Sequence, residues 1–271
     1  MHSKRLITAL ILIPSVALLI VIGGKFWLAV FINVICIMAL WEYFRIVLNN
    51  DRSMVAMIFR ILTFVTGSAV IWAAYFHSID IVLDIIALNA VVSAVVSIFK
   101  FKSDPSVCEI VFKQVVGVIY VPLFLSYLLL IRNGRNGEVW IFLLLIVVYM
   151  GDAAAYYAGT YLGRHKLCPA VSPNKTVEGA FGGLLTSLVA GALYKCFLLP
   201  RLPWGLGLLF FLSMGISGQL GDLFESELKR VARIKDSGTL LPGHGGVLDR
   251  IDAVLFAAPV AYFFKAYAFS G

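Results

Sequence analysis

The sequence predicts an all-α, polytopic integral membrane protein with about nine transmembrane helices and a cytoplasmic N-terminus. Of its 271 residues, 61% are apolar and only 14% are charged, whereas a soluble protein averages about 25% charged residues. The apolar residues form runs close to the ~20 residues that a helix needs to cross the hydrocarbon core. No β-barrel alternation is visible, so helices are expected to satisfy the backbone hydrogen bonds.

Nine apolar runs are candidate spans, separated by breaks that carry glycine, proline, asparagine or charged residues. The first run follows Met-His-Ser-Lys-Arg, is long for a signal peptide and precedes no Ala-x-Ala-like cleavage site, so we interpret it as a retained helix. The expected spans are residues 6–22, 26–48, 54–75, 79–99, 112–131, 139–161, 176–199, 203–223 and 250–268.

The basic residues indicate the orientation of these spans. With the N-terminus in the cytoplasm, sixteen Lys and Arg residues fall on the cytoplasmic side and six on the other, as the positive-inside rule requires. Because the first five spans contain few polar residues, we expect residues 1–135 to form five scaffold helices. Residues 136–271 are expected to form catalytic helices 6–9, with a cytoplasmic active-site loop at residues 224–249. Glu42, in the scaffold, is interpreted as an interfacial or interhelical acid.

The most informative stretch is residues 222–252, a charged segment between two apolar runs that contains eleven charged side chains. His244 lies among Gly243, Gly245 and Gly246, which remove side chains where a backbone could approach a ligand closely. Carboxylates bind Mg²⁺, Lys and Arg neutralise phosphate oxygens, and glycine amides point at them. This composition is typical of a metal–phosphate site.

Two acidic pairs border this stretch. Asp222 and Glu225 close the eighth run, and Asp249 and Asp252 open the last one. The two members of each pair are three positions apart and so share a helix face. Carboxylates at the start of a helix are favoured by its dipole and could hold a metal ion near a nucleotide. A salt-bridged helix end is the structural alternative.

Two polar features lie upstream. Asp152 is inside the sixth run, where an ionisable group is unfavourable unless it is paired or hydrated. Asn174, Lys175 and Thr176 stand at the start of the seventh run, where Asn174 or Thr176 could cap the helix and its N-terminus could bind an anion. A structural acid at Asp152, and capping alone at the seventh run, are the alternatives.

The charged stretch also has a characteristic spacing. It begins with Ser226-x-Leu228-Lys229-Arg230. After four intervening residues it continues with Lys235-Asp236-x-Gly238-x-x-Leu241-Pro242-x-His244-Gly245-Gly246-Val247-x-Asp249-Arg250-Ile251-Asp252. This pattern resembles the signature of the phosphatidate cytidylyltransferase (CDP-diacylglycerol synthase) family. The motifs Gly151-Asp152 and Ser172-Pro173-Asn174-Lys175-Thr176 resemble upstream elements of the same family.

The resemblance implies that CTP and phosphatidate give CDP-diacylglycerol and pyrophosphate, with Mg²⁺ and room for a second metal ion. It also implies a homodimer, and no nucleic-acid partner is expected. The compact chain suggests a bacterial plasma membrane, and the distribution of basic residues places the expected active site at the cytoplasmic face. The expected metal ligands are Asp222 and Asp249, then Asp152 and Asp252. The expected catalytic residues are Asp222, Asp249, Lys229, Arg230, Lys235, Asp236, His244 and Arg250. The expected substrate contacts are Asn174, Lys175, Thr176, Ser226, Gly245 and Gly246.

Other functions remain open at this point. A CTP-dependent lipid kinase would share part of the chemistry but would transfer the γ-phosphoryl group. An ion-coupled transporter of an anionic substrate would use Asp152 and Asp222 as cation sites, but the ionisable residues gather at one membrane face and no inverted repeat is visible. A CDP-alcohol phosphotransferase is disfavoured because the chain lacks an Asp-Gly-x-x-Ala-Arg run.

Overall fold

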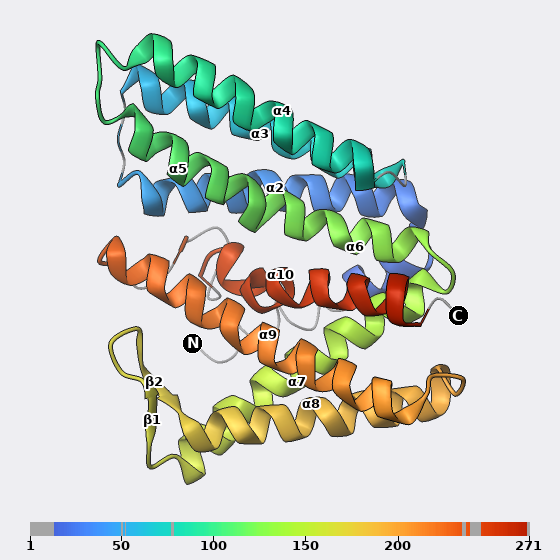
Figure 1. Ribbon diagram of the computed structural model, residues 1–271. Helices are drawn as coiled ribbons and strands as arrows, with labels where there is room; N and C mark the ends of the chain where they lie inside the picture. Colours follow the sequence, from blue (N-terminus) through green and yellow to red (C-terminus); the bar gives the residue numbers. More distant parts are fainter. Residues whose placement is uncertain are drawn as a thin grey trace. The chain divides into compact units, whose positions relative to one another are not determined.

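The computed structural model describes residues 14–49, 51, 53–76, 79–234, 237–238 and 245–269. Helices dominate these ranges, as the sequence predicts (Figure 1). Residues 14–21 are helical. The elements that follow are α2 (Gly24–Val47), α3 (Met54–Tyr75), α4 (Ile79–Lys100), α5 (Val107–Val118), the π-helical turn η1 (Ile119–Leu123), α6 (Phe124–Asn133), α7 (Gly137–Leu162), β1 (Lys166–Cys168), β2 (Ser172–Thr176), α8 (Val177–Leu198), α9 (Trp204–Val231), α10 (Leu248–Phe263) and the π-helical turn η2 (Phe264–Ala268).

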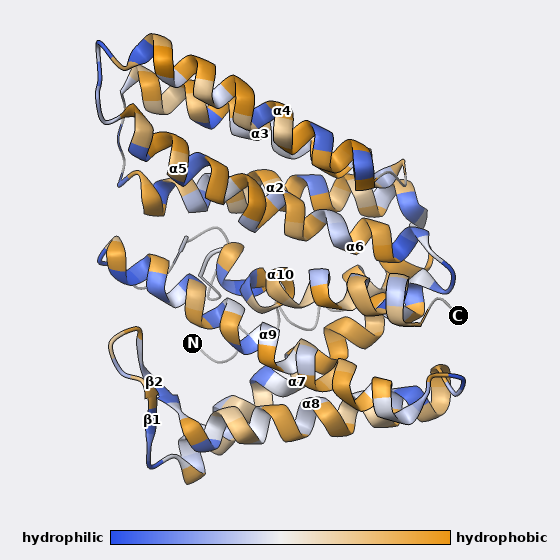
Figure 2. Ribbon diagram, in the orientation of Figure 1, coloured by the Kyte–Doolittle hydropathy of each residue, from blue (hydrophilic) through white to orange (hydrophobic). Residues whose placement is uncertain are grey.

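In the described part of the chain, eight helices are long and apolar enough to cross a membrane. They correspond to the second to ninth expected spans, but Trp204–Val231 continues past the expected end at residue 223 into the expected loop, and Val107–Asn133 begins before the expected start at residue 112. Two are composite: Val107–Asn133 joins α5, η1 and α6, and Leu248–Ala268 joins α10 and η2. Most of the first expected span, residues 6–22, lies outside the described residues. Figure 2 shows apolar residues along most of each helix and hydrophilic ones at the end of α9 and in the β1–β2 hairpin. The predicted all-α membrane fold is confirmed.

The chain divides into two compact units. Unit 1 contains the described residues of Met1–Asn133 together with Val231–Asp249, and unit 2 contains those of Gly134–Arg230 and Arg250–Gly271. The described residues of the expected active-site loop from Val231 onward therefore fold with the N-terminal helices, whereas the upstream polar motifs and the charged residues of α9 up to Arg230 belong to unit 2.

Unit 1 contains a buried polar network between α3, α4 and α5. Asn89 Nδ2 donates to Thr66 Oγ1 at 2.8 Å, and Gln114 Nε2 donates to Asn89 Oδ1 at 2.9 Å. Ser93 Oγ donates to Gln114 Oε1 at 3.1 Å. These bonds satisfy polar side chains that would otherwise be unpaired in an apolar interior, and they join three helices.

In unit 2, α7 and α8 approach closely because small residues line their contact. A Cβ atom on Gly183 would lie 2.9 Å from both the Ala155 Cβ and the Gly151 carbonyl oxygen. A Cβ atom on Gly179 would lie 2.7 Å from the Ala155 carbonyl oxygen. Such close backbone approach is a common means of packing helices in membranes, where lipid and side chains are equally apolar. It places the Asp152 turn of α7 beside the start of α8.

The antiparallel hairpin of β1 and β2, which connects α7 to α8, is not predicted by the apolar pattern. Its base is fixed by Glu178 in the first turn of α8, whose carboxylate accepts the backbone N–H of Arg164 at 3.0 Å and contacts His165 Nδ1 at 2.6 Å. Thr176 Oγ1 accepts the Gly179 N–H at 3.1 Å, which confirms the predicted helix cap. Lys175 is thereby placed directly before the α8 N-terminus.

Candidate functional site

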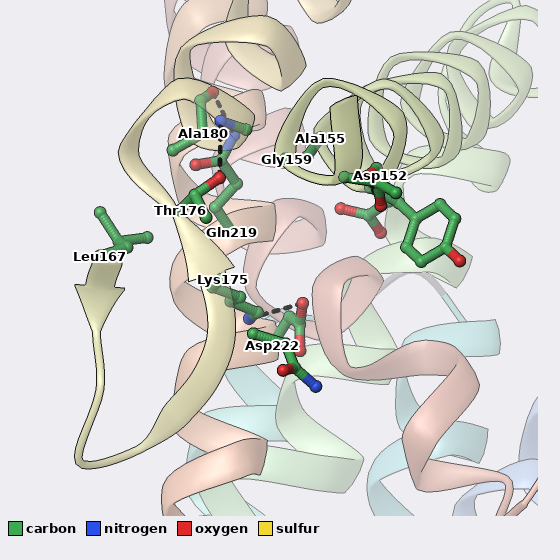
Figure 3. Close-up of a pocket in the computed structure, with 13 residues that line it drawn as sticks. Asp152, Ala155, Gly159, Leu167, Lys175, Thr176, Ala180, Gln219 and Asp222 are labelled. Atoms are coloured by element: carbon green, nitrogen blue, oxygen red, sulfur yellow. Dashed lines mark hydrogen bonds and ion pairs between the residues drawn. The ribbon is translucent and has the colours of Figure 1, made fainter. Parts of the chain in front are cut away.

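A cavity of about 410 Å³ lies in unit 2, lined by residues of α7, the hairpin, α8 and α9. Its walls include Asp152 from α7, Asn174, Lys175 and Thr176 from β2, and Asp222 from α9 (Figure 3). The sequence singled out these polar features separately, in three different segments. The fold brings them to one cavity.

An ion pair joins two of these segments. Lys175 Nζ lies 2.6 Å from Asp222 Oδ2, and the two side chains remain 25% and 37% exposed. Figure 3 shows Lys175 reaching from β2 to Asp222 on α9. A cation and an acid are therefore both accessible at the cavity, beside a helix N-terminus that favours negative ligands.

Three carboxylates gather in this unit. Asp152, Asp222 and Asp252 lie close enough for their charges to interact. Asp252 is only 9% exposed, and Gly221 allows α9 to approach the Asp252 backbone of α10. Within the described residues, no three His, Cys, Asp or Glu side chains already converge as metal ligands. The donor chemistry still fits a hard cation such as Mg²⁺, which prefers carboxylate oxygens.

The cytoplasmic end predicted for α9 carries two basic residues of the sequence pattern. Lys229 forms an ion pair with Glu225, which lies one turn earlier on the same helix. The side chain of Glu225 is fully buried. Lys229 is also within electrostatic range of Asp252. Arg230 Nε donates to the Val171 carbonyl in the hairpin loop at 2.9 Å. These contacts join the end of α9 to the acidic cluster and to the hairpin.

The remaining predicted residues are distributed as follows. Ser226 is buried on α9. Arg250, at the start of α10, is exposed, and its carbonyl accepts the Tyr149 hydroxyl at 3.1 Å. Lys235, Asp236 and His244 lie outside the described residues, and their expected roles stay predictions.

Asp249, Gly245 and Gly246 belong to unit 1, in the segment that precedes and opens α10. Asp249 Oδ2 accepts the Gly246 N–H at 2.8 Å and the Ser237 N–H at 3.0 Å. Gly245 has a φ of 80°, in the left-handed region that glycine adopts most readily. Asp249 is therefore fixed in orientation by the backbone of its own segment.

Several residues near these positions carry no signal in the sequence pattern. Gln219 lines the cavity and donates to the Ala180 carbonyl at 3.0 Å, and Tyr156 and Thr160 also line it. Tyr156 and Thr160 follow Asp152 on α7, and Gln219 precedes Asp222 on α9, all at helical spacing. That spacing is the only sequence signal that could have indicated them.

Glu42 is fully buried, and its carboxylate accepts hydrogen bonds from Ser237, Val247 and Leu248. Two of these three donors are backbone N–H groups at the start of α10. Glu42 therefore joins α2 to α10, as expected of an interhelical acid, but it does so through backbone groups of the partner segment.

Comparison with known proteins identifies the family of the chain. The profile of the cytidylyltransferase family matches residues 3–268. A phosphatidate cytidylyltransferase of Bacillus subtilis is 36% identical over 272 residues, which cover 97% of this chain and 97% of that protein. Phosphatidate cytidylyltransferases of Staphylococcus haemolyticus and Mycobacterium bovis are 43% and 39% identical over 144 residues, covering 53% of this chain and 55% and 47% of theirs. With a family match along almost its whole length, and with Asp152, Lys175 and Asp222 at one cavity, the chain belongs to the cytidylyltransferase family.

Proposed function

We propose that this protein transfers the cytidylyl group of CTP to phosphatidate, giving CDP-diacylglycerol and pyrophosphate in phospholipid biosynthesis. The observation that carries the proposal is the cavity that Asp152, Lys175 and Asp222 all line, which includes residues of both upstream motifs of the resemblance. The relative from Bacillus subtilis, which aligns over 97% of both chains, has this name.

The reaction needs charge neutralisation more than it needs a base. A phosphate monoester has a second pKa near ~6, so phosphatidate is largely dianionic at neutral pH and its oxygen can attack without a strong general base. That oxygen forms a bond to the α-phosphorus of CTP, while the bond from the α-phosphorus to the bridging oxygen breaks and pyrophosphate leaves. The difficulty is to bring two anions together.

The chain's own cations address this difficulty. Lys175 stands at the cavity beside the α8 N-terminus, and both favour phosphate oxygens. Lys229 and Arg230 lie on the last turns of α9, in the same unit. We infer that these groups orient the triphosphate and stabilise the negative charge that develops on pyrophosphate.

Mg²⁺ is the proposed cofactor. Asp222 and Asp152 at the cavity, with Asp252 in the same unit, are the residues that would hold it. The expected role of Asp249, in unit 1, as a metal ligand stays a prediction. When bound, the ion neutralises phosphate oxygens and polarises the phosphoryl group. We further propose that the protein is a homodimer in a bacterial plasma membrane and that its site faces the cytoplasm, where the distribution of basic residues places it.

Product analysis tests the function directly. Purified protein in detergent would receive CTP labelled at the α-phosphate, phosphatidate and Mg²⁺. The proposal predicts label in the lipid phase and an equimolar release of pyrophosphate. Label retained as CDP, with a newly phosphorylated lipid, would instead identify a CTP-dependent lipid kinase. Absence of both reactions across lipid substrates would favour binding or transport.

Replacing Lys175 with Met is expected to lower kcat/KM for CTP by roughly tenfold or more, because a hydrogen bond to a charged group contributes about 1.5–3 kcal/mol. The matched control is Lys166→Met, since Lys166 is an exposed lysine on the other strand of the hairpin. Initial rates at varied CTP would measure both variants. Equal losses in the two would mean that only the general positive charge of the hairpin matters.

A further inference from the structure

Glu42 of α2 is a buried charged group that the proposed reaction does not use. Its side chain is 0% exposed, and a buried carboxylate is strongly unfavourable without hydrogen-bond partners. Its Oε1 accepts the Val247 N–H at 3.0 Å, and its Oε2 accepts the Leu248 N–H at 2.8 Å. The Ser237 hydroxyl lies 2.9 Å from Oε2. All three donors come from the segment that leads into α10, here called the signature loop (residues 237–249, of which 237–238 and 245–249 are described).

The signature loop is shaped to receive this carboxylate. A Cβ atom on Gly238 or on Gly246 would collide with the Glu42 carboxylate, so glycine is required at both positions. Arg45, one turn further along α2, donates to the Ser237 carbonyl. Two residues on one helix turn thus bind the loop on both sides of its undescribed part.

The same contacts reach Asp249. The Ser237 hydroxyl lies 3.0 Å from Asp249 Oδ2 as well as 2.9 Å from Glu42 Oε2, so its single hydrogen is shared between the two carboxylates. The backbone N–H groups of three successive residues are also divided between them. Gly246 donates to Asp249, and Val247 and Leu248 donate to Glu42. These N–H groups precede or open α10 and have no acceptor within the helix itself.

We propose that Glu42 is a positioning residue for the cytidylyl transfer, which orients the described ends of the signature loop and through them the carboxylate of Asp249. The inference rests on the proposed function, because Asp249 is expected to act in that reaction. A carboxylate is required, since both of its oxygens accept hydrogen bonds. A glutamine would present only one acceptor and would direct its NH₂ group at N–H or O–H donors.

The test compares Glu42→Gln, Ser237→Ala and their double variant in the full-length protein, each purified in detergent. The matched control is Asn89→Leu, which breaks the buried hydrogen bonds to Thr66 and Gln114 elsewhere in unit 1. For folded, monodisperse protein, we expect Glu42→Gln to lower kcat at least about tenfold while KM for CTP changes less than about threefold. Ser237→Ala should lower kcat by a smaller factor, and the double variant should be no worse than Glu42→Gln, because the residues act through one network.

Asn89→Leu should lower the melting temperature with little change in kcat. If Glu42→Gln behaves like this control, with lower thermal stability and unchanged kcat, the residue is only structural and the proposal is overturned. Should Glu42→Gln fail to fold, Ser237→Ala with Arg45→Lys replaces it, and unchanged kcat in both would overturn the proposal.

Limited trypsin digestion without substrates separates this inference from the proposed function. Arg233 is exposed just before the signature loop. Cleavage there should be faster in Glu42→Gln than in the wild type and in Asn89→Leu, whichever reaction the enzyme catalyses. An unchanged digestion rate overturns the inference even if cytidylyl transfer is established. Failure of the wild type to label lipid overturns the proposed function, while the digestion result still reports whether Glu42 holds the loop.

Discussion

Replacing Asp222 with Asn should lower kcat for CDP-diacylglycerol formation by at least about 100-fold, comparable to removing a group that stabilises developing charge in other enzymes. The substitution keeps the size of the side chain but removes its negative charge from the cavity that Asp152 and Lys175 share. The lost ion pair is partly exposed, so the free energy of unfolding should change by no more than about 1 kcal/mol. Transfer of α-phosphate label from CTP to lipid measures the effect.

The control for this prediction is Glu227→Gln. Glu227 lies on the same helix, but its side chain is exposed and does not line the cavity. It should retain activity within about twofold of the wild type. If Asp222→Asn retained activity at any Mg²⁺ concentration, Asp222 would have no essential role in the reaction.

Replacing Gly183 with Leu should prevent unit 2 from folding. The new side chain would begin 2.9 Å from the Ala155 Cβ, the Gly151 carbonyl oxygen and the Gln219 Nε2. Two of these three atoms belong to α7 and one is backbone, so the helices would have to separate. Overpacking a core usually costs about 1–3 kcal/mol, and a clash with backbone across a whole helix contact should exceed that range. The yield of monodisperse protein and its thermal midpoint are the measurements.

Gly205→Leu is the matched control, because no heavy atom lies within 4 Å of the Cβ position at Gly205 and the residue is exposed. It should be purified in wild-type yield and with wild-type activity. A stable, active Gly183→Leu variant would show that α7 and α8 tolerate a wider separation, and the close glycine contact would then not be what forms the cavity.

The extent of the membrane helices was predictable because it is a local property. Each span needs about 20 successive apolar residues, and eight helices of the structure match eight of the nine predicted runs. The hairpin was not predictable in the same way. The two strands within residues 166–176 are short and mix polar with apolar residues. Their conformation depends on the hydrogen bonds that the Glu178 carboxylate accepts from the backbone of Arg164 and His165.

Glu42 illustrates the other limit of sequence reasoning. It lies near the end of an apolar run, where an acid at the membrane interface is a reasonable interpretation. Its partner Leu248 is 206 positions away, and nothing in the local pattern around Glu42 indicates that partner. The glycines at 238 and 246 do appear in the sequence pattern, but only the structure shows that they make room for the Glu42 carboxylate.

The sequence by itself determined the fold class, the spans and the reaction class, because hydrocarbon-length apolar runs and a closely spaced signature are both readable along the chain. Only the tertiary structure decided which residues meet. Lys175 reaches Asp222 because small residues let α7 and α8 pack closely. In addition, Thr176 at the end of β2 caps α8, which places β2 directly at the α8 N-terminus. Such contacts depend on the packing of whole helices, which no single stretch of sequence encodes.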